Sequence, residues 1–177
     1  MRHINLATAL ALCACAMLHL SGCAGGTNGW LILTDADQRR AIERYRTALA
    51  KEPDDWMLQK RLGLAYFDLK DYALAEHSLE RAQAINPGEP ESLLYLGLSR
   101  IGKGERETGL DQLATFRWPF KFYHQQFVQE EANRLRKHPE EPSEQVIKDI
   151  LEALKKGKRE QWEMESDTPS GRRPNWY

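Results

Sequence analysis

The sequence has no cysteine after residue 23, because Cys13, Cys15 and Cys23 all lie near its start. A secreted domain stapled by disulfide bonds needs paired cysteines along its length, and a zinc site built from thiolates needs them close to its other ligands. This distribution excludes both. The fold must therefore rest on a hydrophobic core, for which the chain offers 41% hydrophobic residues.

An excess of one charge and recognisable catalytic motifs are also missing. The net charge is −1 with acids and bases interspersed, so nothing indicates nucleic acid as a partner. His77, His124 and His138 belong to no metal-binding or nucleophile motif, and neither "GTNG" nor "GKGE" carries the lysine and hydroxyl of a phosphate-binding loop. The sequence therefore predicts no enzyme, no metal and no cofactor.

No apolar run reaches the roughly 18 residues of a membrane span. The longest, "LATALALCACAML" at 6–18, follows a basic start and precedes small residues, which is the layout of a secretory signal peptide. Leu20-Ser21-Gly22-Cys23 resembles the lipobox of bacterial lipoproteins. That resemblance implies removal of residues 1–22 and acylation (diacylglycerol, palmitate) of Cys23. An ordinary signal peptide that contains a cysteine is the alternative.

Residues 23–34 would then form a lipidated, Gly-rich and flexible tether. Ala24, in place of aspartate, points by the usual sorting rule to the periplasmic face of the outer membrane.

A period of thirty-four residues dominates the rest of the chain. Leu-Gly-Leu occurs at 62–64 and again at 96–98, and Pro53 and Pro87 are separated by the same interval. Helix-compatible repeats of this length resemble tetratricopeptide units, each a pair of antiparallel helices. The unit starting at Trp56 matches the family's pattern of large and small residues at Leu62, Gly63, Tyr66, Ala75, Leu79, Ala82 and Pro87.

The neighbouring units depart from that pattern. Upstream, only the second helix of a repeat is recognisable. Downstream, Arg100 stands where an aromatic residue is usual, Gly109 where alanine is usual, and Lys121 replaces the proline. We therefore expect a drifted helix pair at 90–102 and 105–117.

The resemblance implies an all-α fold, a short tetratricopeptide-type solenoid of helical hairpins over 35–118. It would comprise a lone helix at 35–52, a clear repeat at 56–87, a divergent repeat at 90–118, capping helices at 119–165 and a disordered tail at 166–177.

The resemblance also implies a binding surface, because tetratricopeptide domains bind peptides along the inner faces of their first helices. The corresponding residues here are Met57, Lys60, Leu64, Phe67, Glu91, Leu94, Leu98 and Ile101. Within each helix they are three or four residues apart and so share one face. That face is largely apolar, and it lacks the asparagines of the family's carboxylate clamp. The alternative is that the chain's own C-terminal helices cover it.

Two further stretches stand out. "FRWPFKFYHQQF" at 116–127 offers a possible aromatic patch at Trp118, Phe120, Phe122 and Tyr123, or an aromatic cap on the last repeat. "KKGKR" at 155–159 is either a solvated helix end or a contact for anionic lipid.

The favoured interpretation is a lipid-anchored adaptor or scaffold that binds an envelope protein or peptide during assembly or secretion, with homodimerisation left open. The alternative is a glycan-binding or cell-wall-enzyme-associated protein that uses segment 116–127, which requires exposed, coplanar rings.

Overall fold

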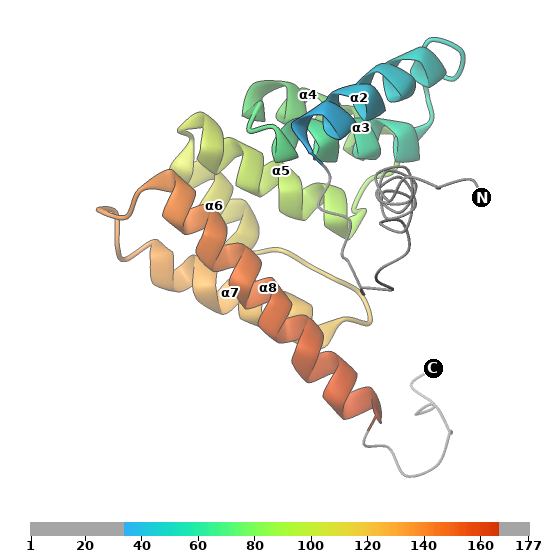
Figure 1. The fold of residues 1–177 in the computed structure, drawn as a ribbon. Coiled ribbons are helices and arrows are strands. Elements are labelled where there is room, and N and C mark those ends of the chain that lie inside the picture. Colours follow the sequence, from blue (N-terminus) through green and yellow to red (C-terminus); the bar gives the residue numbers. More distant parts are fainter. Residues whose placement is uncertain (1–33, 167–177) are drawn as a thin grey trace, which may run out of the picture. The chain divides into compact units, whose positions relative to one another are not determined.

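The computed structural model describes residues 34–166, which form an all-α fold (Figure 1). In chain order the helices are α2 (Asp35–Leu49), α3 (Trp56–Asp68), α4 (Tyr72–Ile85), α5 (Pro90–Lys103), α6 (Arg106–Ala114), α7 (Phe122–Leu135) and α8 (Ser143–Ser166). The predicted signal peptide and residues 23–33 of the predicted tether, Cys23 included, lie outside the described residues, as do residues 167–177 of the predicted tail. Thr34, the last residue of that tether, caps α2, and Ser166, the first residue of that tail, is the last residue of α8.

Capping side chains set where several helices begin. At α2, Thr34 accepts a hydrogen bond from the Asp37 N–H, and the Asp37 carboxylate accepts one from the Thr34 N–H at 3.0 Å, which is a capping box. Asp55 accepts from Met57 N and Leu58 N at the start of α3. At α5, Pro90 occupies the first turn, where its missing N–H costs nothing.

The helices pack as successive hairpins, as the sequence predicted. α3 pairs with α4, α5 with α6, and α7 with α8, while α2 packs alone against α3 (Figure 1). The last helix, α8, also packs against α5, three helices earlier in the chain. The C-terminal hairpin therefore folds back onto the solenoid as well as extending it.

Close approach within the hairpins depends on the repeated small residues. A Cβ atom added to Gly63 would lie 2.6 Å from Cγ of Leu79 and 3.2 Å from the Ala75 carbonyl oxygen. One repeat later, a Cβ on Gly97 would lie 3.0 Å from Cγ of Leu113. The same place in each hairpin therefore receives a leucine from the opposite helix, which explains why Leu-Gly-Leu recurs.

Two buried clusters form the core. The smaller contains Ile42, Leu62 and Ala65 and joins α2 to α3. The larger extends from Phe67 through α5, α6 and α7 to Leu154 in α8. The C-terminal helices are thus part of the main core.

The divergent repeat ends earlier than predicted. Its second helix stops at Ala114, whereas the sequence suggested residue 117. Pro119 has no N–H to donate and disfavours helical backbone at the preceding Trp118. Instead, Lys121 N donates to Trp118 O at 3.1 Å and closes a turn, and Phe120 adopts a φ of 62° within it. None of the helices within 34–166 is long and apolar enough to cross a membrane.

Gly157 of α8 packs directly against the backbone of the first turn of α7. A Cβ there would lie 2.5 Å from the carbonyl oxygen of Tyr123 and 3.0 Å from Cα of His124. Both are backbone atoms, which cannot move aside as a side chain can.

We therefore predict that Gly157→Ala lowers the free energy of unfolding by about 1–3 kcal/mol through overpacking. Helix propensity alone would raise it by about 1 kcal/mol, so the two effects differ in sign. Urea denaturation measures the difference, with Lys158→Ala on the same helix as control. A variant as stable as wild type would show that α7 and α8 are not this close.

Candidate partner-binding surface

The inner face predicted for partner binding divides into an open and a covered part. Met57 is 47% exposed and Leu64 half-buried, both on α3. Phe67, at the end of the same helix, is buried. On α5, Leu94, Leu98 and Ile101 have no exposed surface at all. These last four side chains are therefore not available to a partner in this structure.

Helix α8 supplies much of the cover. Its residues Val146, Ile147, Ile150 and Leu154 belong to the same buried cluster as Leu94, Leu98 and Ile101. The chain thus places its own helix against the second repeat, where a solenoid of this kind would hold a peptide. Of the two alternatives that the sequence left open, an open or a covered face, the structure has the covered one at the second repeat.

Lys60, also predicted to bind a partner, is already paired. Its Nζ lies 2.9 Å from Glu91 Oε2 and 3.2 Å from Glu89 Oε1, and 5.4 Å from the centre of the Trp56 ring. Burial opposes the charge on Lys60, but the two carboxylates outweigh it and raise the pKa of the ammonium group. A partner's carboxylate would have to compete with both, so this lysine does not form a ready anion site.

Glu89 links this pair to the next repeat. Its other oxygen accepts from Ser92 N at 2.7 Å and from Ser92 Oγ at 2.6 Å, which caps the start of α5. The Lys60–Glu89 contact therefore fixes α3 relative to the first turn of α5. The open face consists of Met57 and Leu64, bordered by this ionic group and by Glu91, whose side chain is 41% exposed.

A second ionic network lies between α4, α5 and α6, and its one signal in the sequence is a departure from the repeat pattern. Arg100 stands where the repeat pattern has an aromatic ring. Its guanidinium donates to Glu76 at 3.1 Å, to Glu80 at 2.9 Å and to Gln112 at 2.6 Å. Lys103 also donates to Glu76. A charged network thus replaces the packing of the missing ring.

Glu76 is the central acid of this network, and its side chain is only 11% exposed. Burial alone would raise the pKa of its carboxyl, but the hydrogen bonds from Lys103 and Arg100 outweigh burial and leave the pKa below its ordinary value.

The predicted aromatic patch is divided. Trp118 is half-buried and packs against Phe116 and His124, with ring centres 5.8 and 5.0 Å away. Phe120 and Phe122 are exposed, at 90% and 64%.

Two neighbouring pairs of rings in this segment are steeply inclined to each other. The planes of Phe122 and Tyr123 are inclined by 76°, and those of Phe116 and Trp118 by 84°. Neither pair supplies the two coplanar rings that a sugar platform uses.

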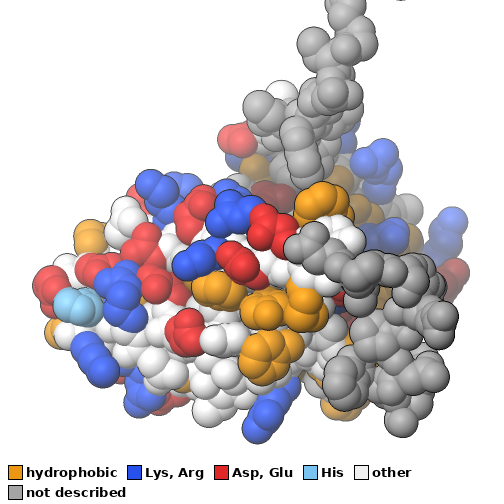
Figure 2. Space-filling model, turned by 90° about the horizontal axis from the view of Figure 1, so that it is seen from below, with side chains coloured by type: hydrophobic (Ala, Val, Ile, Leu, Met, Phe, Trp, Pro, Cys, Tyr) orange, Lys and Arg blue, Asp and Glu red, His pale blue; other side chains and the backbone are white. Residues whose placement is uncertain are grey.

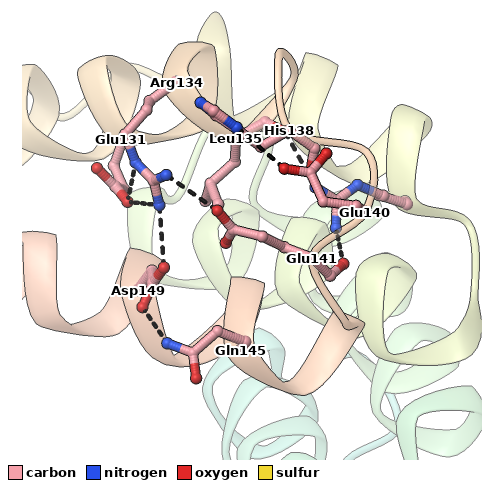
Figure 3. A network of polar contacts seen from close by, with 9 residues as sticks. Glu131, Arg134, Leu135, His138, Glu140, Glu141, Gln145 and Asp149 are labelled. Carbon is pink, nitrogen blue, oxygen red and sulfur yellow. Dashed lines mark hydrogen bonds and ion pairs between the residues drawn. The ribbon is translucent and has the colours of Figure 1, made fainter.

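Acidic side chains around the α7–α8 connection form hydrogen bonds and ion pairs within the domain (Figure 3). Arg134 on α7 donates to Glu131 at 2.7 Å, to Glu141 at 3.0 Å and to Asp149 on α8 at 3.0 Å. Arg106 donates to backbone oxygens of the same connection, including Glu141 O at 2.7 Å. Across residues 34–166, no three Asp, Glu, His or Cys side chains come together as metal ligands.

Comparison with known families supports the assignment made from the repeat pattern. Residues 35–90 match the family described as "Tetratricopeptide repeat". Residues 35–90 therefore form a tetratricopeptide repeat segment of the chain. The match covers α2, α3 and α4, the part in which the residue pattern is clearest. Neither the curated proteins nor the solved structures that were compared give a match.

Tetratricopeptide domains are typically non-catalytic scaffolds that bind other proteins, and partner binding of that general kind is what the family match indicates. Beyond the matched residues, the described fold continues with α5, α6, α7 and α8. Sequence reasoning left coverage of this face by the C-terminal helices as one of two alternatives, and the apolar stripe at Val146, Ile150 and Leu154 indicated that α8 buries one face.

The covered inner face makes a prediction about stability. Leu98→Ala removes a fully buried side chain and should lower the free energy of unfolding by about 2–5 kcal/mol. Met57→Ala, on the open part of the same surface, should change it by less than about 0.5 kcal/mol. Chemical denaturation distinguishes the two. Equal small effects would mean that α8 does not cover α5.

The ionic network makes a prediction about pH. Glu76→Gln should lower the free energy of unfolding at neutral pH by roughly 1–3 kcal/mol, because Arg100 and Lys103 lose a buried partner. Because the pKa of Glu76 is lowered in the folded state, its contribution is complete above the ordinary value of 4.5 and disappears as the pH falls below it. Denaturation curves of both proteins should therefore converge in acid. If the two proteins still differ in free energy of unfolding at acidic pH, the charge of the Glu76 carboxylate is not the cause of the difference.

Proposed function

We propose that this protein is a membrane-anchored tetratricopeptide adaptor, which holds a protein partner at the bacterial cell envelope. The observation that supports it best is the unequal inner face. The second repeat is filled by α8, whereas Met57 and Leu64 of the first repeat stay accessible on a rigid helix. An adaptor needs one such preformed surface, because a rigid surface loses little entropy on binding.

The open face suits a short segment with one or two apolar side chains. Met57 and Leu64 lie two helical turns apart on α3 and supply the apolar contact. Methionine adapts to irregular partners because its side chain is unbranched and flexible. The Lys60–Glu89–Glu91 group limits this face on one side and leaves an exposed acid, Glu91, for a basic or amide group of the partner.

The lipobox-like sequence supplies the proposed anchor. Acylation of Cys23 would confine the domain to one membrane, and the periplasmic face of the outer membrane is the location that Ala24 favours by the sorting rule. Confinement raises the effective concentration of domain and partner toward each other, so a small binding face suffices. Roles in envelope assembly or in secretion both fit this arrangement.

Photocrosslinking in living cells tests the adaptor. With p-benzoylphenylalanine at position 57 of the full chain, we expect a discrete protein adduct that is missing when the probe replaces Leu74, an exposed residue on α4. Adding Leu64→Gln should reduce the adduct about fivefold or more if Leu64 contributes to the interface core. A yield that is the same at both positions, or unchanged by Leu64→Gln, would contradict binding at this face.

The anchor has a separate test. Cys23→Ala should abolish incorporation of labelled fatty acid and move the protein from the membrane to the soluble fraction or leave its leader uncleaved. The mass of the wild-type N-terminal peptide is the direct measurement. An unmodified cysteine thiol there would exclude lipidation even if the partner adduct forms.

A further inference from the structure

One end of the described domain displays large apolar side chains that the adaptor function does not use. Phe120 is 90% exposed, Trp162 68%, Phe122 64% and Met164 51%. We call these four residues the aromatic tip. They come from the turn before α7, the first residue of α7 and the last two turns of α8.

Several contacts hold these segments side by side. The Tyr123 N–H points at Gln161 Oε1, 3.5 Å away, and Lys121 Nζ lies 3.6 Å from Glu165 Oε1. The close approach at Gly157 brings the same part of α8 against the first turn of α7. In Figure 1, α8 points away from the solenoid at this end, and Figure 2 views the molecule from that side, where hydrophobic side chains gather beside charged ones.

Phe120 is displayed by an unfavourable backbone conformation. The turn from Trp118 to Lys121 has Pro119 in its second position and Phe120, with a φ of 62°, in its third. That combination is the pattern of a type II turn, whose third position favours glycine. A phenylalanine there brings strain, and 90% exposure means that few contacts within the described domain offset it. A strained backbone at an aromatic residue that packs on almost nothing in the domain indicates that the Phe120 side chain contacts something outside the domain.

The surroundings of the tip are basic. Segments 117–123 and 155–166 carry six basic and three acidic side chains. Arg117, Lys158 and Arg159 are exposed, and none of them forms an ion pair within residues 34–166. Positive charge free of internal partners is therefore concentrated beside the exposed rings.

We propose that the aromatic tip inserts into the headgroup region of a membrane that contains anionic lipid. Tryptophan and phenylalanine are the side chains that anchor proteins at that depth, and lysine and arginine around them are attracted to anionic headgroups. A protein partner fits less well, because lysine is depleted in the cores of protein interfaces and the rings here are not gathered into one pocket.

This inference goes beyond the proposed adaptor and does not depend on acylation of Cys23. If both hold, the tip is a second attachment point, and it fixes how the solenoid is oriented on the bilayer. The open face at Met57 would then be presented in a defined direction.

Photocrosslinking to lipid tests the proposal on the full chain. p-Benzoylphenylalanine at position 120 keeps the aromatic ring, and the same probe at Leu74 reports proximity that arises from any other attachment. With vesicles of phosphatidylcholine and phosphatidylglycerol, we expect at least about tenfold more lipid adduct at 120 than at 74, decreasing at high salt as the Lys and Arg charges are screened. Equal lipid yields, or a protein adduct in cells and no lipid adduct at 120, would overturn the proposal.

Two variants separate the contributions of the rings and the charges. Phe120→Gly removes the ring and relieves the turn, so the domain stays folded while lipid adducts from a probe at position 162 should fall severalfold. Lys158→Glu with Arg159→Glu should reduce the yield on mixed vesicles to that on phosphatidylcholine alone. Unchanged yields in both variants, with unfolding midpoints equal to wild type, would show that neither the Phe120 ring nor these charges hold the tip at the bilayer, and would overturn the proposal. Because the adaptor test uses a protein adduct at position 57, either proposal can fail alone.

Discussion

The burial of α5 is the constraint on which the rest of the structure depends. Leu94, Leu98 and Ile101 have no exposed surface, and they are enclosed by residues of the neighbouring hairpins and of α8. A short solenoid has few repeats over which to distribute its hydrophobic surface, so an end that is not capped would leave apolar area in water. Packing α8 against α5 removes this apolar area from water, and it also covers the inner face of the second repeat.

That arrangement separates the two surfaces for which we propose functions. The first repeat keeps an accessible strip at Met57 and Leu64, because α8 reaches only as far as α5 and the end of α3. At the opposite end, α8 continues past the start of α7, and its last turns carry Trp162 and Met164 into solvent. A partner and a membrane would thus contact separate parts of the domain, as an anchored adaptor requires.

At Arg100, a departure from the repeat pattern is compensated by polar contacts. Arg100 replaces a ring, and it is held by Glu76, Glu80 and Gln112. The connection between α7 and α8 is tied by Arg134 in the same manner (Figure 3). Each network links side chains of different helices, so it opposes movement of those helices relative to one another. This is a physical reason why a repeat can drift in sequence and keep its fold.

The sequence alone determined the all-α class, the hairpin order and the places where helices approach closely, because helix periodicity and the spacing of small residues are local properties of the chain. Gly63 and Leu79 illustrate this, since their contact follows from the repeat pattern itself. Only the tertiary structure decided that α8 covers α5, that Lys60 is already paired, and that Phe120 is displayed while Trp118 is packed. Each of these depends on which distant segment of the chain packs against an apolar or charged surface. The apolar stripe of α5, for example, is compatible with a bound peptide or with the chain's own helix.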